Sequence, residues 1–160
     1  MTSIIQIVGY KNSGKTTLTA HLVGALTQAG CKVGTIKHDG HRFDIDQEGT
    51  DTWRHREAGA SMTAITSSER TVVMEEKSSE LDAIIRRMLA MDAIIVEGFK
   101  EADYPKVVMI RSAEDVELVH RLRQVIAVVT WAPALSFPVP TFSIHQTDQL
   151  VAWLMPTLSR

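Results

Sequence analysis

The sequence is poor in cysteine, and this shortage excludes two kinds of structural cross-link. Among 160 residues there is a single cysteine, Cys31, and aromatic side chains make up 6%. One thiol forms neither a disulfide within the chain nor a cysteine-based zinc cluster, so we expect a cytoplasmic protein in a reducing environment. Nine glycines and five prolines are too few for a collagen-like or low-complexity chain, which leaves an ordinary globular protein.

The sequence also lacks an excess of either charge. Seventeen Lys and Arg residues nearly balance nineteen Asp and Glu residues, for a net charge of −2. We therefore expect no nucleic-acid partner and no membrane partner. The first ten residues lack the basic segment of a signal peptide, so we expect none. Residues 125–144 are uncharged and nearly long enough to span a bilayer, but they contain three prolines, which predicts a strand, a loop and a strand.

Apolar runs alternate along the chain with segments of helical periodicity. We predict strands at residues 4–8, 31–36, 61–66, 71–75, 93–96, 106–110, 125–129 and 139–144. We predict helices at residues 18–29, 50–58, 79–89, 112–122 and 147–156. Continuously apolar strands separated by helices indicate a mostly parallel central sheet flanked by helices on both faces. We expect this α/β architecture in a single domain over residues 1–160.

The strongest motif follows the first predicted strand and opens the first predicted helix. It matches G-x-x-x-x-G-K-[ST], the phosphate-binding loop, and predicts the three-layer fold of P-loop NTPases. Backbone N–H groups at such a helix start surround phosphate, a lysine reaches the β- and γ-phosphates, and a hydroxyl coordinates Mg²⁺. The expected phosphate-binding residues are Gly9, Tyr10, Lys11, Asn12, Ser13, Gly14, Lys15, Thr16 and Thr17.

A carboxylate ends the predicted strand at residues 93–96. Parallel strands end at a common edge of the sheet, so we expect Glu97 to lie near the phosphate loop. There it would bind Mg²⁺ together with Thr16, or orient the attacking water. We therefore expect Lys15 and Glu97 to be the catalytic residues. The alternative for Glu97 is an acid that only caps a turn.

A polar segment follows the second predicted strand and should emerge at the same edge. Its histidines and carboxylates suit a switch or substrate loop that orders around nucleotide and magnesium. Two alternatives stay open, a transition-metal site built from His38, His41 and Asp39 or Asp44, and a solvated polar loop. The candidate residues of the switch or substrate loop are His38, Asp39, His41, Asp44, Asp46 and, beyond Glu97, Lys100.

The segment after the strand at residues 125–129 does not identify a nucleobase. Guanine-specific P-loop proteins often carry Asn-Lys-x-Asp at the corresponding place, whereas this chain reads Thr130-Trp131-Ala132-Pro133. Trp131 is a candidate for stacking on a base, and a loop anchor is the alternative. From these residues alone, guanine and adenine are not distinguished.

Taken together, these motifs resemble the MobB family of molybdopterin-guanine dinucleotide biosynthesis adapter proteins. The resemblance spans nearly the whole chain and is looser over the last thirty or so residues. It is carried by Gly9 to Thr17, Lys37-His38 with His41, Phe43-Asp44 with Asp46, Gly49, Asp51, Arg54, Ala58-Gly59-Ala60 and Val96-Glu97-Gly98-Phe99-Lys100.

The resemblance implies a protein that binds GTP with Mg²⁺ and slowly hydrolyses it to GDP and phosphate. It implies a homodimer that assists a MobA-type guanylyltransferase in molybdenum cofactor biosynthesis, with molybdopterin or molybdoenzyme maturation factors as further candidate partners. Two other classes stay open, a small-molecule kinase and a metal-insertion GTPase. A kinase would need an arginine-bearing lid, for which Arg42, Arg54 and Arg56 are the candidates, and a metal-insertion GTPase would need a His-rich or Cys-containing tract.

Overall fold

The structure is a computed structural model that describes residues 1–159. It divides into two compact units, one formed by Met1–His38 with the chain from Leu81 onward, the other by Asp39–Glu80. The prediction of a single domain over residues 1–160 stays a prediction.

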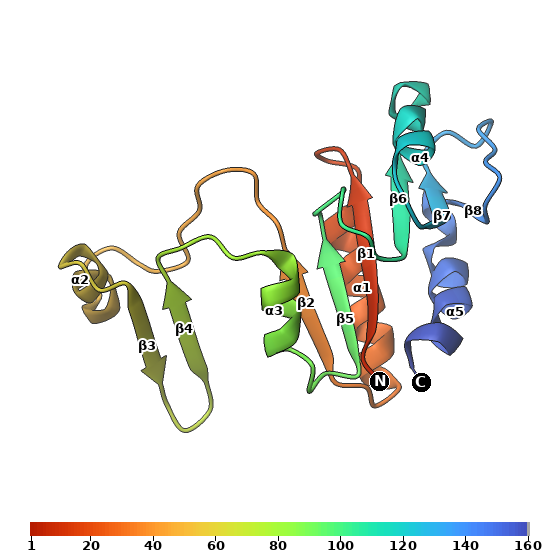
Figure 1. The fold of residues 1–160 in the computed structure, drawn as a ribbon. Helices are drawn as coiled ribbons and strands as arrows, with labels where there is room; N and C mark the ends of the chain where they lie inside the picture. The colour runs from red at the N-terminus through yellow and green to blue at the C-terminus, as the bar shows by residue number, and fades with distance from the viewer. Residues whose placement is uncertain (160) are drawn as a thin grey trace. The chain divides into compact units, whose positions relative to one another are not determined.

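The larger unit is built on a six-stranded sheet in which every pairing is parallel. The strand order is β2-β5-β1-β6-β7-β8, so β1 lies between β5 and β6 (Figure 1). The strands are β1 (Ser3–Gly9), β2 (Val33–Lys37), β5 (Ala93–Glu97), β6 (Lys106–Ile110), β7 (Val125–Thr130) and β8 (Thr141–Ser143). This arrangement confirms the predicted fold class and places all six carboxyl ends at one edge.

Helices cover both faces of this sheet because alternate residues of each strand point to opposite sides. α1 (Lys15–Gln28) and α5 (Thr147–Leu158) pack on the face that carries Ile5 and Ile7. On the other face, α3 (Leu81–Arg87) covers the side chains of Ile94 and Val96. α4 (Glu117–Arg121), preceded by a 3₁₀ turn at Ala113–Val116, covers Val8 and its neighbours on β6 and β7. The result is the expected three-layer architecture.

Two segments near the carboxyl end of the chain refine the prediction. The terminal helix was expected to end near Pro156, but α5 continues to Leu158. Leu158 is 2% exposed, so its packing in the core holds the last turn beyond the proline. The uncharged stretch at residues 125–144 forms β7, a loop and β8, as expected. Within residues 1–159, no helix is both long and apolar enough to cross a membrane.

The smaller unit contains one helix and one hairpin. α2 (Asp51–Glu57) begins at Thr50, whose hydroxyl accepts a hydrogen bond from the Trp53 N–H. β3 (Met62–Thr66) and β4 (Thr71–Glu75) pair antiparallel as a two-stranded sheet, at the positions predicted. No residue of α2 is buried, so little apolar packing holds the helix in place.

Candidate phosphate-binding site

The motif Gly9–Thr16 forms the connection from β1 to α1, at the carboxyl edge of the parallel sheet. A side chain at Gly9 would collide with its surroundings, because an added Cβ would lie 2.6 Å from Ser13 Oγ and 2.9 Å from Met109 Cβ. Gly14 is left-handed, with φ of 95°, and directly precedes α1 without a side-chain cap. The first N–H groups of α1 therefore remain free to bind an anion.

Two side chains of the loop add hydrogen-bond donors to this cradle. Lys15 Nζ lies across the loop and donates to the Tyr10 carbonyl at 2.8 Å. Ser13 Oγ is buried and has no hydrogen-bond partner among residues 1–159. A buried hydroxyl without a partner is costly unless something binds there, so the geometry fits a phosphate oxygen.

Positive charge gathers around Lys15. Burial lowers the pKa of Lys15, and the neighbouring cations Lys100, Lys37 and Arg111 lower it further, while Glu97 opposes the shift. Lys100 is held nearby, with its Nζ 4.5 Å from the centre of the Tyr10 ring. Clustered cations repel one another and are stabilised by a shared anion, as a polyphosphate would provide.

Glu97 lies beside the phosphate loop, where its position at the end of β5 predicted it. The Thr16 hydroxyl donates to Glu97 Oε1 at 2.9 Å, and Lys37 Nζ lies 3.4 Å from the same oxygen. The carboxylate is 7% exposed. A hydroxyl and a carboxylate are oxygen ligands of the kind Mg²⁺ prefers, so this pair fits the predicted metal ligands.

The turn after β5 depends on a residue that the sequence did not single out. Gly98 and Phe99 both adopt positive φ, 96° and 51°, and the buried Gln6 donates to both of their carbonyls at 3.0 and 2.7 Å. The His38 ring packs against Phe99, with the ring centres 4.6 Å apart. A polar residue inside an otherwise apolar strand was the available signal for Gln6.

Arg111 is a second residue that the sequence reasoning missed. It follows β6 directly, and its Nη1 donates to the Lys11 carbonyl of the phosphate loop at 3.0 Å. Its Nε and its backbone N–H both donate to Asp115 Oδ2, at 3.2 and 2.9 Å. Its position could have indicated this contact. Arg111 follows β6, the neighbour of β1, so it lies at the same edge of the sheet as the phosphate loop.

Asp115 does not form the capping box that its spacing from Ser112 suggests. The Ser112 side chain makes no cap, and the Asp115 carboxylate turns to Arg111 instead. Asp115 is 3% exposed. Burial raises the pKa of this carboxyl, but the hydrogen bonds from Arg111 outweigh burial and leave the pKa below its ordinary value. The charge-assisted hydrogen bonds from Arg111 stabilise the buried carboxylate more than a neutral helix cap would.

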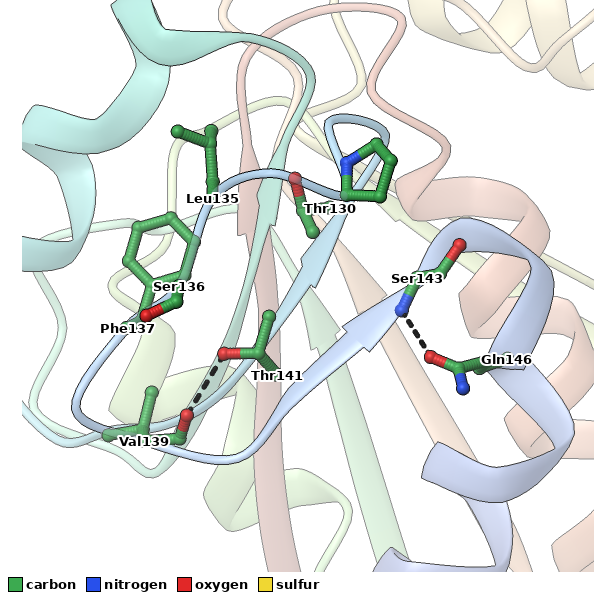
Figure 2. A pocket seen from close by; sticks show the side chains of 9 residues that line it. Thr130, Leu135, Ser136, Phe137, Val139, Thr141, Ser143 and Gln146 are labelled. Atoms are coloured by element: carbon green, nitrogen blue, oxygen red, sulfur yellow. Dashed lines mark hydrogen bonds between the residues drawn. The ribbon is translucent and has the colours of Figure 1, made fainter.

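Trp131 anchors the loop after β7 to the phosphate loop. Its Nε1 donates to the Ser13 carbonyl at 3.1 Å, which supports the loop-anchor interpretation. A cavity of about 430 Å³ lies between β8 and the loop that joins β7 to β8, lined by residues from Thr130 to Gln146 (Figure 2). No local pattern in the sequence indicates this cavity, because most of its wall comes from a loop without regular periodicity.

The polar segment divides between the two units. His38 and Lys100 lie in the larger unit, at Phe99 and Tyr10, whereas the acids of the segment form contacts inside the smaller unit. Asp39 accepts the His41 N–H at 3.0 Å. Over residues 1–159 no three His, Cys, Asp or Glu side chains gather as a metal site, so the transition-metal alternative finds no support in the geometry.

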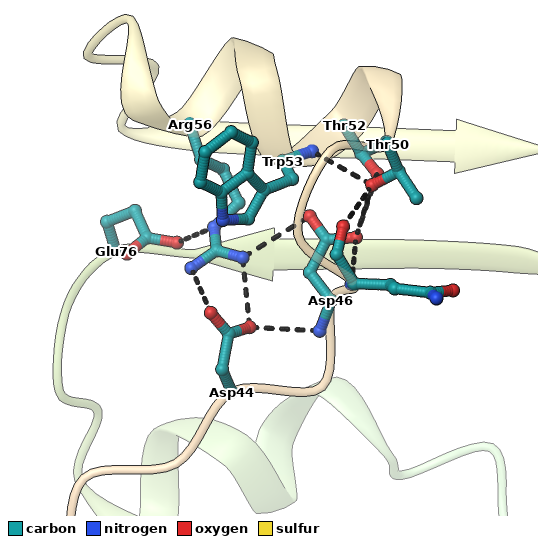
Figure 3. Close-up of polar contacts among 8 residues, drawn as sticks. Asp44, Asp46, Thr50, Thr52, Trp53, Arg56 and Glu76 are labelled. Atoms are coloured by element: carbon teal, nitrogen blue, oxygen red, sulfur yellow. Dashed lines mark hydrogen bonds and ion pairs between the residues drawn. The ribbon is translucent and has the colours of Figure 1, made fainter.

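Arg56 joins the remaining acids of the segment to the hairpin (Figure 3). Its guanidinium contacts Asp44 at 3.0 Å, Asp46 at 3.3 Å and Glu76 at 2.8 Å. The hydrogen bond from Arg56 lowers the pKa of Asp44 below its ordinary value. With three carboxylates around it, Arg56 is committed to the smaller unit rather than free to act as a lid arginine.

Comparison with known proteins gives consistent matches. The family model of MobB, molybdopterin guanine dinucleotide synthesis protein B, matches residues 4–131. A molybdopterin-guanine dinucleotide biosynthesis adapter protein of Escherichia coli is 32% identical, with 100% of this chain and 95% of the relative covered. One of Haemophilus influenzae is 36% identical, covering 81% of this chain and 75% of the relative. The crystal structure of Bacillus subtilis MobB has a TM-score of 0.82 at 30% identity, with 98% of each chain covered.

Proposed function

The chain belongs to the MobB family, and from this we infer that it is a GTP-binding adapter in the biosynthesis of molybdopterin guanine dinucleotide. The relatives are named as adapters in that biosynthesis, which supports a role beside a partner enzyme rather than a synthase activity of its own. We take the partner to be a MobA-type guanylyltransferase, with molybdopterin or molybdoenzyme maturation factors as further candidates.

One observation carries the nucleotide part of the proposal. The connection from β1 to α1 has a glycine, Gly9, at a place where any Cβ would collide with its surroundings. It also has free N–H groups at the start of α1, and the Lys15 side chain lies across the loop. These features suit the phosphates of a nucleoside triphosphate. We choose GTP because the molecule made in this biosynthesis contains guanine.

The residues of the site have separable roles in this proposal. Lys15 neutralises charge on the phosphates, and Thr16 with Glu97 would hold Mg²⁺. Bound Mg²⁺ would supply positive charge against the β- and γ-phosphates. Glu97 would also orient the attacking water. Hydrolysis to GDP and phosphate is expected to be slow. The Arg111 guanidinium is hydrogen-bonded to the Lys11 carbonyl and to Asp115, so it does not extend past the loop toward the γ-phosphate.

Lys15→Ala tests the nucleotide site. We expect the fold to persist and the affinity for GTP to fall by at least tenfold, or about 1.4 kcal/mol, because the main side-chain cation of the loop is lost. Isothermal titration with GTP and Mg²⁺ measures this. Lys32→Ala is the matched control, since Lys32 is exposed and directly precedes β2 at the opposite edge of the sheet. A change within about threefold in Lys15→Ala would contradict the assignment of the phosphate loop.

The partner is tested by pull-down from a cell that makes molybdoenzymes. With GTP and Mg²⁺ present, we expect the guanylyltransferase to be captured by the wild-type chain and less by Lys15→Ala. If wild type and Lys15→Ala capture the guanylyltransferase equally, partner binding does not depend on nucleotide binding. Transfer of phosphate from the nucleotide to a small acceptor would instead identify a kinase.

A further inference from the structure

We propose that the cavity between β8 and the loop that joins β7 to β8 binds the base of the nucleotide, and that the side-chain amide of Gln146 makes it prefer guanine to adenine. The inference rests on the proposed function, because it needs a nucleotide whose phosphates lie in the loop between β1 and α1. It adds the place of the base and a residue that distinguishes the two purines.

The first argument is position. Thr130 and Ser143 line the cavity, and each is the last residue of its strand. The next residues along the chain reach the phosphate loop: Trp131 Nε1 donates to the Ser13 carbonyl at 3.1 Å, and Ile144 Cδ1 lies 3.6 Å from where a Cβ on Gly14 would be. The chain that lines the cavity therefore continues directly into two residues that contact the phosphate loop.

The second argument is shape and polarity. The cavity has a volume of about 430 Å³, within the range typical of small-molecule sites. Leu135, Phe137 and Val139 supply apolar wall on one side, and Ser143 and Gln146 lie on the other (Figure 2). A planar aromatic base suits such a site, because its faces are apolar and its edges carry hydrogen-bonding groups.

The third argument is the orientation of the Gln146 amide. Its Oε1 accepts the Ser143 N–H at 2.8 Å. A backbone N–H requires an acceptor, so this contact fixes which end of the amide is oxygen. The Nε2 group has no partner among residues 1–159 and remains a donor. Ser143 Oγ accepts the His145 N–H, which leaves its own O–H available as a second donor.

Free donors distinguish the two purines. Guanine presents two neighbouring acceptors, O6 and N7, whereas adenine presents N7 beside an amino group that is itself a donor. The Gln146 Nε2 donor therefore matches guanine O6 and opposes the adenine amino group, whereas the Ser143 hydroxyl can bond to either purine. The described residues that line the cavity include no Asp or Glu, so no carboxylate there accepts a hydrogen bond from the guanine 2-amino group. The selectivity should depend on O6 and be moderate, about three- to tenfold for one hydrogen bond.

Competition binding with GTP, ITP and ATP tests this inference. We expect ITP to compete like GTP, because it keeps O6 and N7 and lacks only the 2-amino group, and ATP to compete three- to tenfold less well. Gln146→Glu keeps an oxygen for the Ser143 N–H but replaces the donor by an acceptor. We expect this variant to lose the preference for GTP over ATP or to reverse it.

Gln149→Glu is the matched control, because it makes the same change one turn further along α5, outside the cavity. It should keep the wild-type order of GTP and ATP. An unchanged preference in Gln146→Glu, with both nucleotides still bound, would overturn the inference and leave the proposed phosphate site intact. If wild type bound neither nucleotide, both proposals would be overturned.

Photolabelling locates the base directly and does not depend on any variant. With 8-azido-GTP and Mg²⁺, mass spectrometry should find the label within residues 130–146, and excess GTP should suppress it. A label placed only outside these residues would overturn the inference. This outcome is distinct from failure of the phosphate site, which would abolish specific labelling altogether.

Discussion

Single residues of the candidate site act by joining segments that are far apart in sequence. Thr16 and Glu97 share a hydrogen bond although 81 positions separate them, and Arg111 reaches the carbonyl of Lys11, 100 positions away. Each of these contacts crosses from one strand end to another. Substitutions at these residues should therefore separate effects on binding, on turnover and on stability.

Glu97→Gln should reduce turnover more than binding. The variant keeps the size of the side chain and removes its charge, which matters most where phosphoryl transfer needs a positioned metal and water. We expect kcat for GTP hydrolysis to fall about ten- to a hundredfold, or ~1.4–2.7 kcal/mol, with a smaller change in affinity. Single-turnover hydrolysis at saturating Mg²⁺ measures this, with the exposed Glu114→Gln as control. An unchanged rate would move the role to Asp39, Asp44 or Asp46.

Arg111→Met should destabilise the protein in a way that depends on pH. Removing the guanidinium leaves the buried Asp115 carboxylate without its charged partner, at a cost of about 1–3 kcal/mol. Because Arg111 holds the pKa of Asp115 below its ordinary value, this stabilisation is complete above about pH 4 and is lost as pH falls through the lower folded-state pKa.

Urea unfolding at pH 7 and at decreasing pH checks the Arg111 prediction. The gap between wild type and Arg111→Met should narrow in acid. Arg121→Met is the control, since the exposed Arg121 pairs with the exposed Glu101 and the change should alter stability by under about 1 kcal/mol. Equal losses in the two variants, or a gap that does not vary with pH, would show that the pairing of Arg111 with the buried Asp115 has no special role.

At the scale of elements, α2 and the hairpin are held mainly by polar contacts. α2 buries no residue, and Arg56 is the side chain that ties it to the preceding acids and to Glu76 after β4. Apolar burial normally supplies most of the stability of a short helix, so this unit depends unusually on one guanidinium. Local opening here should be easier to provoke than in the parallel sheet.

Arg56→Gln should loosen this unit without unfolding the rest of the chain. We expect faster hydrogen exchange over residues 44–57 by mass spectrometry, and wild-type exchange in β1 and β5. The adjacent Arg54→Gln is the control, because Arg54 has no hydrogen bond or ion pair through its side chain in residues 1–159. Unchanged exchange in Arg56→Gln would mean that the hairpin alone holds α2.

The Arg56 cluster should also respond to acid. The hydrogen bond from Arg56 lowers the pKa of Asp44, so Asp44 stabilises the unit above its ordinary pKa of about 3.9 and loses this effect as pH falls through the lower folded-state value. The side-chain carboxyl carbon resonance of Asp44 should thus stay nearly constant from pH 7 to pH 5 and change only in stronger acid. A change centred near pH 6 would contradict this origin.

At the scale of the whole molecule, the hairpin exposes apolar side chains that one copy of the chain leaves uncovered. Met62, Ile65 and Val73 are 54%, 53% and 51% exposed, on a sheet of only two strands. Two-stranded sheets are marginal in water, and their free edges readily pair with another chain. This is the physical reason for expecting the homodimer that the family resemblance implies.

Sedimentation should give twice the monomer mass of 17.7 kDa at micromolar concentration. Val73→Lys should shift the equilibrium toward monomer, because Val73 shares a face of the hairpin with Met62 and the lysine would place a charge on the face that a second copy would cover. Leu89→Lys is the control, since Leu89 is similarly exposed but follows α3 in the larger unit. A monomeric wild type would refute the dimer, and dissociation by both variants would place the interface elsewhere.

Much of this molecule was predictable from local pattern. The strands at residues 106–110 and 71–75 have the predicted bounds, and the phosphate loop opens α1 as its motif requires. These features depend on neighbours in sequence, namely apolar runs, helical spacing and glycines where a Cβ would collide. The placement of Glu97 was predictable for a related reason, because all carboxyl ends of a parallel sheet meet at one edge.

The amino-acid sequence by itself therefore determined the α/β class, the phosphate loop and the edge at which the site forms. Only the tertiary structure decided that Gln6 holds the turn after β5, that Asp115 turns to Arg111 instead of capping a helix, and that Arg56 collects three carboxylates. The reason is physical. Hydrogen bonds and ion pairs are short-ranged, so a polar side chain's partner depends on which distant segments the strand order brings within a few ångströms.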